Sequence, residues 1–321
     1  MSQYAVTNPA TGEVVETFDG ATDQQIQDAI AASKEAYADW STQTFSYRAE
    51  RLKKLADLLR TNSRELAEVS CTEMGKPLDE MLEEIEFSAE IIDYYADNGE
   101  KFASEQQIPT QGGNAVLRRL PIGPLLGIMP WNFPYYQVAR FAGPNLMLGN
   151  TIILKHAEIC PRSALRFEEL TREAGIPAGV YTNVFATHEQ ISDIIADRRI
   201  QGISLTGSER AGAAVAAQAG DQLKKVVLEL GGTDPYILLD TDDVAAAAKL
   251  AFTTRMVNTG QACNSNKRMI VMEDIYDEFV AELVKLAQEM RPTTWDDVEE
   301  GTYYPLSSRN AAEALRKQLD D

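Results

Sequence analysis

The chain has 321 residues, enough for two domains or for one large α/β domain with a second lobe. Its formal net charge of -19, which suits solubility or adaptation to high salt, repels phosphate backbones and anionic membrane surfaces and argues against a nucleic-acid partner. Hydrophobic residues make up 44% of the chain, which is typical of a globular protein. No apolar run is long enough to cross a bilayer, and the segment MSQYAVTNPATGEVVE lacks a signal-peptide pattern. We therefore expect a cytoplasmic protein with no membrane partner.

The first third of the sequence is predicted to be mainly helical. Thr22 and Gln25 form a capping box, and the apolar residues that follow recur at helical spacing as far as Trp40. A second amphipathic helix is expected over about residues 47–70, and a third after Pro77.

The pattern changes to α/β after Gly112 and Gly113, which mark a turn. Residues 115–120 are predicted to form a strand of a projecting hairpin near residues 105–120. Short apolar runs then alternate with helical stretches, as in a parallel sheet with crossover helices. These strands are expected at residues 125–129, 151–154, 203–205, 226–230 and 236–239. A domain boundary is expected where the strand ending near Glu229 runs into Gly231 and Gly232.

Lys155 and the Gly207-Ser208 turn are candidates for binding a dinucleotide. Free backbone N–H groups at the helix start in GSERAG can hold a pyrophosphate, but the three-glycine fingerprint is missing and an ordinary βα turn is at least as common. Lys155 ends the strand TIILK, at the edge where open α/β sheets bind ligands. A solvated lysine is the better explanation of that residue taken alone.

Glu229 and Asn132 are polar residues in settings that suit catalysis. Glu229 stands in the apolar strand VVLELGG, where desolvation would raise its pKa towards that of a general base. A glutamate satisfied by backbone N–H groups or by a basic partner such as Lys225 is an equally weighted alternative. The prolines of PWNFP would hold the Asn132 amide stiffly, as an oxyanion donor must be held, although an asparagine serving its own turn is common.

Among the three cysteines, Cys263 has the setting of a reactive thiol. It lies in the polar, small-residue loop NTGQACNSN before the strand RMIVM, where a thiol can be exposed. Cys71, within a helix, and Cys160, before a proline, fit the more common buried and inert kind. Their odd number and wide spacing indicate free thiols rather than disulfides.

The two histidines, His156 and His188, show no metal-ligand spacing with each other or with the cysteines. We therefore expect no metal site, and a nucleophile in this chain would work without a histidine base.

Five segments occur together in the order and approximate spacing of a known superfamily: PWNFP, LKHAE, LTGSERAG, LELGG and NTGQAC. Over nearly its whole length the chain resembles the aldehyde dehydrogenases, and most closely their succinate-semialdehyde dehydrogenase branch. The resemblance implies an α/β fold in which residues 1–229 hold a helical N-terminal region and a Rossmann-type, dinucleotide-binding cofactor domain. Residues 230–321 would be a partial α/β catalytic domain.

The same resemblance implies a catalytic role for three residues: Cys263 as nucleophile, Asn132 as oxyanion donor and Glu229 as general base. The thiolate would attack an aldehyde, hydride would pass to a nicotinamide, and water activated by Glu229 would hydrolyse the thioester to the acid. The alternatives are a coenzyme A-acylating aldehyde dehydrogenase and an inactive cofactor-binding protein.

For the cofactor, the resemblance implies contacts from a set of residues along one cleft: Trp131, Lys155, Glu158, Gly207 and Ser208. Glu158 matches a position that binds both adenosine ribose hydroxyls. A carboxylate there would repel a 2'-phosphate, so NAD is favoured over NADP.

Substrate class and assembly also follow from the resemblance. Arg140, eight residues after Asn132, matches an arginine that binds the distal carboxylate of succinate semialdehyde, whereas a second family arginine is replaced by Val257. Family members continue past NAAEALRKQLDD, where this sequence ends, into a second cofactor segment and a strand that completes oligomer sheets. We therefore expect apolar surface to be exposed, and a homo-oligomer if that region is present.

Overall fold

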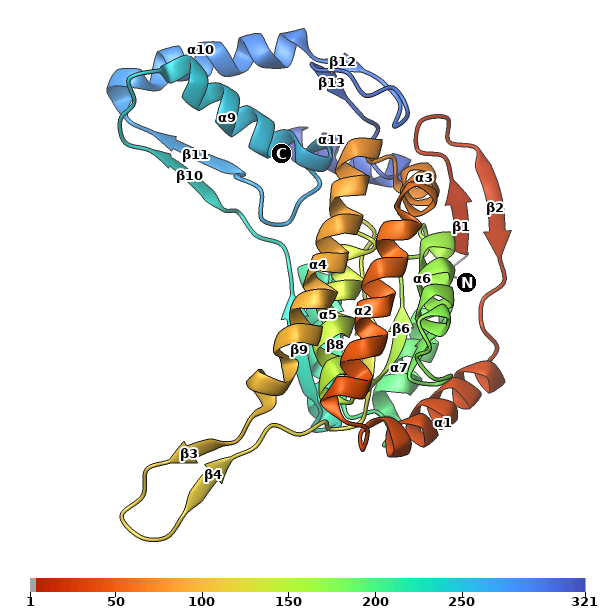
Figure 1. Ribbon diagram of the computed structural model, residues 1–321. Helices are drawn as coiled ribbons and strands as arrows, with labels where there is room; N and C mark the ends of the chain where they lie inside the picture. Colours follow the sequence, from red (N-terminus) through yellow and green to blue (C-terminus); the bar gives the residue numbers. More distant parts are fainter. Residues whose placement is uncertain (1–3, 321) are drawn as a thin grey trace.

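A parallel β-sheet lies at the centre of the computed structural model, which describes residues 4–320 (Figure 1). Its strand order is β7-β6-β5-β8-β9, and all neighbouring strands run parallel. The strands are β5 (Pro124–Ile128), β6 (Thr151–Lys155), β7 (Tyr181–Asn183), β8 (Gly202–Thr206) and β9 (Lys225–Glu229). The expected α/β class with a parallel sheet is confirmed.

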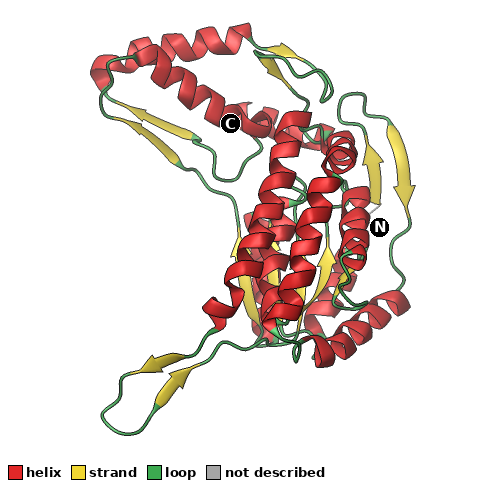
Figure 2. Ribbon diagram, in the orientation of Figure 1, coloured by secondary structure: helices red, strands yellow, loops and turns green. Residues whose placement is uncertain are grey.

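Helices cover both faces of this sheet, as Figure 2 shows. Side chains alternate along the strands, so Leu125 and Ile152 join one hydrophobic cluster while Leu126 and Ile153 join the other. The first cluster is completed by α2 (Phe45–Thr61), α3 (Ser63–Met74), α4 (Leu78–Ala103), α5 (Tyr136–Leu148) and α6 (Pro161–Glu173). The second is completed by α1 (Asp23–Trp40), α7 (His188–Ala196) and α8 (Glu209–Asp221).

The helical predictions hold except for one break. The capping box of Thr22 and Gln25 is present at the start of α1. The single helix expected over residues 47–70 is wrong, because α2 ends at Thr61 and α3 begins at Ser63. Asn62 lies between them with φ -101° and ψ 11°, and its side chain donates to the carbonyl of Leu58. An asparagine that bonds its own backbone in this way competes with the helical pattern.

Two antiparallel hairpins lie outside the central sheet. The arm of β3 (Gln106–Ile108) and β4 (Ala115–Leu117) projects from the molecule, as expected, but the strand predicted to reach residue 120 ends at Leu117 (Figure 1). The hairpin of β1 (Tyr4–Thr7) and β2 (Val14–Phe18) was not expected from the sequence.

The residues after β9 build a second lobe. Strands β10 (Pro235–Leu238) and β11 (Arg268–Val271) pair in parallel, and α9 (Val244–Met256) and α10 (Glu273–Glu289) pack against them around Phe279. The other face of the two strands exposes apolar side chains, among them Ile237 at 58% and Ile270 at 51%. The expected exposed apolar surface is therefore present. The lobe continues through η1 (Val257–Gly260), β12 (Arg291–Pro292), β13 (Thr302–Tyr303) and α11 (Arg309–Asp320). Within residues 4–320, no helix combines the length and the apolar character needed to cross a membrane.

A buried carboxylate joins α3 to α6. Glu73 is fully buried and accepts hydrogen bonds from the backbone N–H of Arg162 at 2.6 Å and from the Ser163 hydroxyl at 2.5 Å. Cys160, the N-cap residue of α6, makes no side-chain cap of its own, so Glu73 supplies the acceptor from outside the helix. Burial raises the pKa of Glu73 to about 7, and the bonds from Ser163 and Arg162 offset only part of this effect.

This pKa predicts a pH-dependent stability. A raised pKa means that the folded chain holds a proton that the unfolded chain releases, so stability is lost as pH rises from the unfolded value of 4.5 through about 7. Glu73→Gln removes the titration. Between about pH 5 and pH 8, the free energy of unfolding of the wild type should fall by up to about 3 kcal/mol relative to the variant, as measured by denaturant unfolding. An equal difference between the two proteins at both pH values would contradict the assignment.

Candidate functional site

Cys263 is exposed on a loop whose backbone is strained. Within η1, Asn258 and Thr259 have φ values of 51° and 52°, in the left-handed region that a β-branched threonine rarely adopts. Such a conformation persists only where its surroundings impose it. The exposed thiol expected at Cys263 is confirmed.

Hydrogen bonds from several elements hold this loop. The Glu80 carboxylate of α4 accepts from the backbone N–H of Asn258 at 2.8 Å. Arg255 donates to the carbonyl of Gly260 at 2.9 Å, and Lys267 donates to the carbonyl of Cys263 at 2.6 Å. The backbone of Cys263 is thereby fixed on the side of the second lobe.

Asn132 reaches this loop from the opposite side of the site. Its Nδ2 donates to the carbonyl of Gln261 at 2.9 Å, and its own carbonyl accepts from Asn258 Nδ2 at 2.8 Å. The asparagine therefore serves the cysteine loop rather than only its own turn. An amide Nδ2 carries two hydrogens, so the bond to Gln261 leaves the second N–H of Asn132 for another acceptor.

One pocket of about 480 Å³ brings together most of the expected site residues. It is lined by Trp131, Asn132, Gly207, Ser208 and Cys263. The first four of these residues follow β5 and β8 at the carboxyl edge of the central sheet, where open α/β sheets bind their ligands, and Cys263 reaches the pocket from the second lobe.

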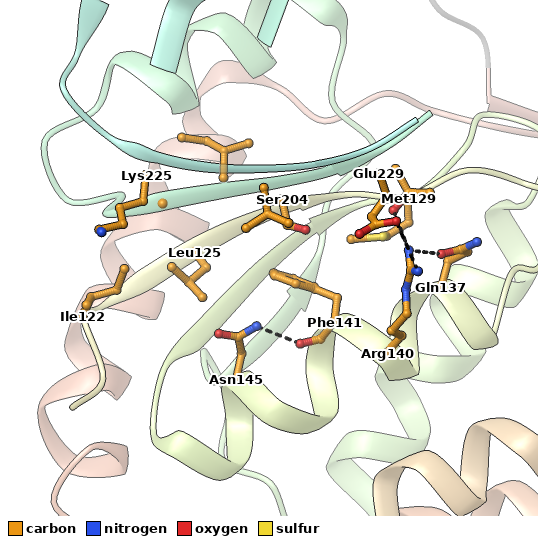
Figure 3. A pocket seen from close by; sticks show the side chains of 14 residues that line it. Ile122, Leu125, Met129, Gln137, Arg140, Phe141, Asn145, Ser204, Lys225 and Glu229 are labelled. Atoms are coloured by element: carbon orange, nitrogen blue, oxygen red, sulfur yellow. Dashed lines mark hydrogen bonds and ion pairs between the residues drawn. The ribbon is translucent and has the colours of Figure 1, made fainter. Parts of the chain in front are cut away.

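Glu229 and Arg140 line a second, adjoining pocket of about 370 Å³ (Figure 3). Arg140 Nη1 lies 3.5 Å from Glu229 Oε2, and its Nη2 donates to Gln137 Oε1 at 2.8 Å. Gln137 and Thr206 line both pockets, which places the ion pair beside the thiol's pocket but outside it.

The expected desolvation of Glu229 is wrong. Its side chain is 54% exposed, and its strand β9 stands at the end of the strand order. This strand is covered on one face only, since Val227 and Glu229 are exposed whereas Val226 and Leu228, which alternate with them, are partly buried. The sequence of β9 is nevertheless as apolar as that of a buried strand. The alternative of a basic partner is confirmed, but the partner is Arg140 rather than Lys225, because the guanidinium facing this carboxylate belongs to Arg140.

Lys155 and Glu158 form an ion pair at the end of β6. Lys155 is only 6% exposed and donates to Glu158 Oε1 at 2.6 Å, so the interpretation of Lys155 as a solvated lysine is wrong. Burial raises the pKa of Glu158, but the charge and the hydrogen bond of Lys155 outweigh it and leave that pKa below its ordinary value. Neither residue lines the pocket of Cys263.

Several residues that support the site were not singled out from the sequence. His156 is buried, and its Nδ1 accepts from the N–H of Ala157, so its Nε2 carries the proton that is donated to the carbonyl of Pro134 at 3.0 Å. Burial lowers the pKa of His156 to about 4, which keeps the ring neutral. Glu80 and Glu84 of α4, and Lys76 just before that helix, also support the site. The signal that could have found the two glutamates is their four-residue spacing on a helix face that also carries the buried Met81 and Ile85.

The fold and the site together define an α/β protein with an exposed thiol at the carboxyl edge of a parallel sheet. The model of the Aldehyde dehydrogenase family matches residues 1–321. The chain is 46% identical to the succinate-semialdehyde dehydrogenase [NADP(+)] of Deinococcus radiodurans, covering 99% of this chain and 66% of that protein. The corresponding protein of Mycobacterium avium is 40% identical, with 99% and 68% covered.

A solved structure described as succinic semialdehyde dehydrogenase from Streptococcus pyogenes in complex with NADP+ as the cofactor matches with a TM-score of 0.95. It is 41% identical, and the match covers 99% of this chain and 70% of that one. The chain therefore belongs to the aldehyde dehydrogenase family. It spans about two thirds of the length of the curated relatives it matches.

The exposures of the three thiols predict selective alkylation. Burial raises the pKa of the Cys71 thiol to about 12 and that of Cys160 well above its ordinary value, and both side chains are fully buried. Iodoacetamide should therefore add one group to the native protein, at Cys263, as measured by peptide mass spectrometry. Cys263→Ser should remain unlabelled, while unfolding in urea should open all three sites of the wild type. Equal labelling of Cys71 and Cys263 in the native protein would contradict this prediction.

Proposed function

We propose that this protein oxidises succinate semialdehyde, or a similar short carboxylated aldehyde, to the acid through a thioester on Cys263. The observation that carries the proposal is the bond of Asn132 Nδ2 to the carbonyl of Gln261, two residues before the exposed thiol. It holds an amide donor against the loop of a nucleophile, which is the arrangement needed to stabilise an oxyanion.

The reaction begins with attack of the Cys263 thiolate on the aldehyde carbon. The carbonyl oxygen becomes an oxyanion, which accepts hydrogen bonds from the remaining N–H of Asn132 Nδ2 and from the backbone N–H of Cys263. A bound nicotinamide dinucleotide supplies the hydride acceptor. Loss of hydride from the former aldehyde carbon leaves a thioester, and water then displaces the thiolate and gives the carboxylic acid.

Glu229 is proposed as the base that takes the proton of this water. Its pocket shares Gln137 and Thr206 with the pocket of Cys263, and its carboxylate is held by Arg140 rather than by burial. A half-exposed carboxylate beside the site retains access to water, which a base for hydrolysis requires.

The dinucleotide is proposed to lie along the carboxyl edge of the sheet, on residues 1–229 acting as the cofactor domain. Ser208 is the N-cap residue of α8, two residues after the end of β8, and a helix start in this position suits a pyrophosphate. An added Cβ at Gly207 would meet only the Leu205 side chain at 3.6 Å, so the backbone there is open to close approach. Trp131 would wall the cleft beside the thiol, and Lys155 and Glu158 would meet the adenosine ribose.

We propose NADP rather than NAD as the preferred cofactor. The NAD preference expected from Glu158 is not supported, since the named relatives are NADP(+) enzymes. The physical reason is the ion pair, because Lys155 neutralises the carboxylate that was expected to repel a 2'-phosphate.

A carboxylated aldehyde fits the charges of the site. The chain as a whole is acidic, with 49 acidic and 30 basic residues, yet the lining of the Cys263 pocket contains Arg255 and Lys267 and no aspartate or glutamate among the described residues. Such a pocket attracts an anion. Arg140 remains the proposed partner of the substrate carboxylate, by the resemblance alone.

The chemistry is tested with two variants of the site. Cys263→Ala should abolish aldehyde-dependent formation of reduced cofactor, measured by absorbance, because no thiohemiacetal can form. Glu229→Gln should accumulate the acyl-enzyme, seen as an added mass on Cys263, because the hydrolytic water keeps its proton. Cys71→Ala changes a thiol outside the pocket and serves as control. Undiminished turnover in Cys263→Ala would refute the proposal, and product formation that requires coenzyme A would refute hydrolysis.

Cofactor preference is tested by binding. NADP should bind roughly tenfold more tightly than NAD, a difference of about 1.4 kcal/mol, measured by calorimetry or quenching of tryptophan fluorescence. Lys155→Gln should remove most of this difference, because it leaves the charge of Glu158 uncompensated. Tighter binding of NAD to the wild type would be the contrary result.

A further inference from the structure

The first two turns of α4 carry two carboxylates that contact the backbone of the segments forming the site. Glu80 and Glu84 are four residues apart and therefore lie on one helical face. The start of α4 also meets the second lobe, since the N–H of Leu78 donates to the carbonyl of Trp295 at 3.1 Å. In Figure 1 this end of α4 lies at the junction of the two lobes.

Glu84 forms hydrogen bonds with the segment that carries Asn132. Its Oε1 accepts from the backbone N–H groups of Tyr135 at 2.9 Å and Tyr136 at 3.1 Å. These are the first amides of α5, whose N-cap residue makes no side-chain cap of its own. Glu84 thereby fixes the chain three and four residues after Asn132.

Lys76 completes this contact. Its Nζ donates to Glu84 Oε2 at 2.5 Å, and it also lies 3.6 Å from the ring centroid of Phe133, the residue next to Asn132. Lys76 is 1% exposed and Glu84 5% exposed. A buried ion pair adds little to stability compared with an apolar pair of similar volume, so its main effect here is to fix geometry.

Glu80 forms a hydrogen bond with the other segment of the site, the loop that leads to Cys263. Its Oε2 accepts from the N–H of Asn258, where the backbone enters the left-handed region before Cys263. Asn258 Nδ2 in turn donates to the carbonyl of Asn132, and Asn132 Nδ2 donates to the carbonyl of Gln261. The two carboxylates of one rigid helix are therefore tied to the two segments whose spacing sets the oxyanion donor against the thiol.

We propose that Glu80 and Glu84 are positioning residues for aldehyde oxidation, acting through Asn132 and the loop of Cys263. This inference rests on the proposed function. Because both residues belong to α4, the helix fixes the distance between the two carboxylates. Each carboxylate in turn fixes the position of one of the two segments that form the oxyanion site. An error of about 1 Å between donor and oxyanion is enough to lose most of such a bond.

The kinetic test uses Glu80→Ala, Glu80→Gln and Glu84→Ala, with the exposed Glu90→Ala on the same helix as matched control. The two alanine variants at 80 and 84 should lower kcat about 10- to 100-fold while the KM for aldehyde and for NADP stays within about twofold, because an oxyanion bond is made chiefly in the transition state. Glu80→Gln should recover to within about threefold of wild type, since its amide oxygen still accepts from Asn258. Glu90→Ala should match the wild type.

A general loss of structure gives a different result. It would lower the thermal midpoint and the fraction of active protein, and it would change KM together with kcat or leave Glu80→Gln as impaired as Glu80→Ala. Wild-type kcat in a folded Glu80→Ala would overturn the proposal. If Glu84→Ala does not fold, the Glu80 series decides the question alone, since Glu80 is only partly buried.

Hydrogen exchange separates this proposal from the proposed function. If the wild-type chain turns over no aldehyde at all, the proposed function fails for this protein, but the contacts are still measurable. Amide exchange at Asn258 in Glu80→Ala, and at Tyr135 and Tyr136 in Glu84→Ala, should be at least about tenfold faster than in Glu90→Ala. Unchanged exchange at these amides would show that the carboxylates do not hold the two segments.

Discussion

The hydrogen bond from Asn132 to the carbonyl of Gln261 is the contact on which the site depends. It joins two segments that are 129 residues apart in sequence, one after β5 of the central sheet and one in the second lobe. Each lobe has its own hydrophobic cluster, so neither core alone sets the distance between the donor and the thiol. Directional polar contacts have to supply that precision, because apolar packing specifies separation only loosely.

The strained turn before Cys263 explains why so many donors and acceptors converge on one short loop. Left-handed φ values at Asn258 and Thr259 cost on the order of 1–3 kcal/mol each in a non-glycine residue. The contacts from Glu80, Asn132 and Arg255 offset this cost, and each is made by a residue outside the loop itself or at its border. These contacts therefore hold the strained loop, and with it the exposed thiol, in one place.

Local signals in the sequence predicted much of this structure, and the failures at the site share one cause. The capping box at Thr22, the apolar runs of the sheet and the polar loop of Cys263 act over a few residues, and they gave the right elements and the right exposed thiol. The exposure of Glu229 and the burial of Lys155 depend on which strand stands at the end of the order and on what packs across it. Strand order is a property of the whole fold, so an apolar strand sequence cannot distinguish a central from an end position. The partners of Glu80 and Glu84 could not be predicted either, because these backbone N–H groups belong to segments remote in sequence.

The placement of negative charge reconciles an acidic chain with a site for an anion. Both glutamates next to the site are engaged by other groups. Glu84 pairs with Lys76 and accepts from two backbone N–H groups, and Glu80 accepts from the N–H of Asn258. On the open side of the same walls the charged residues of the Cys263 pocket are Arg255 and Lys267. The hydrogen bonds to both carboxylates, and the ammonium group of Lys76 beside Glu84, neutralise most of their negative potential at short range. The positive charges that line the pocket are therefore not cancelled by these two glutamates. The same walls can thus be stiffened by acids and still receive the carboxylated aldehyde that we propose as the substrate.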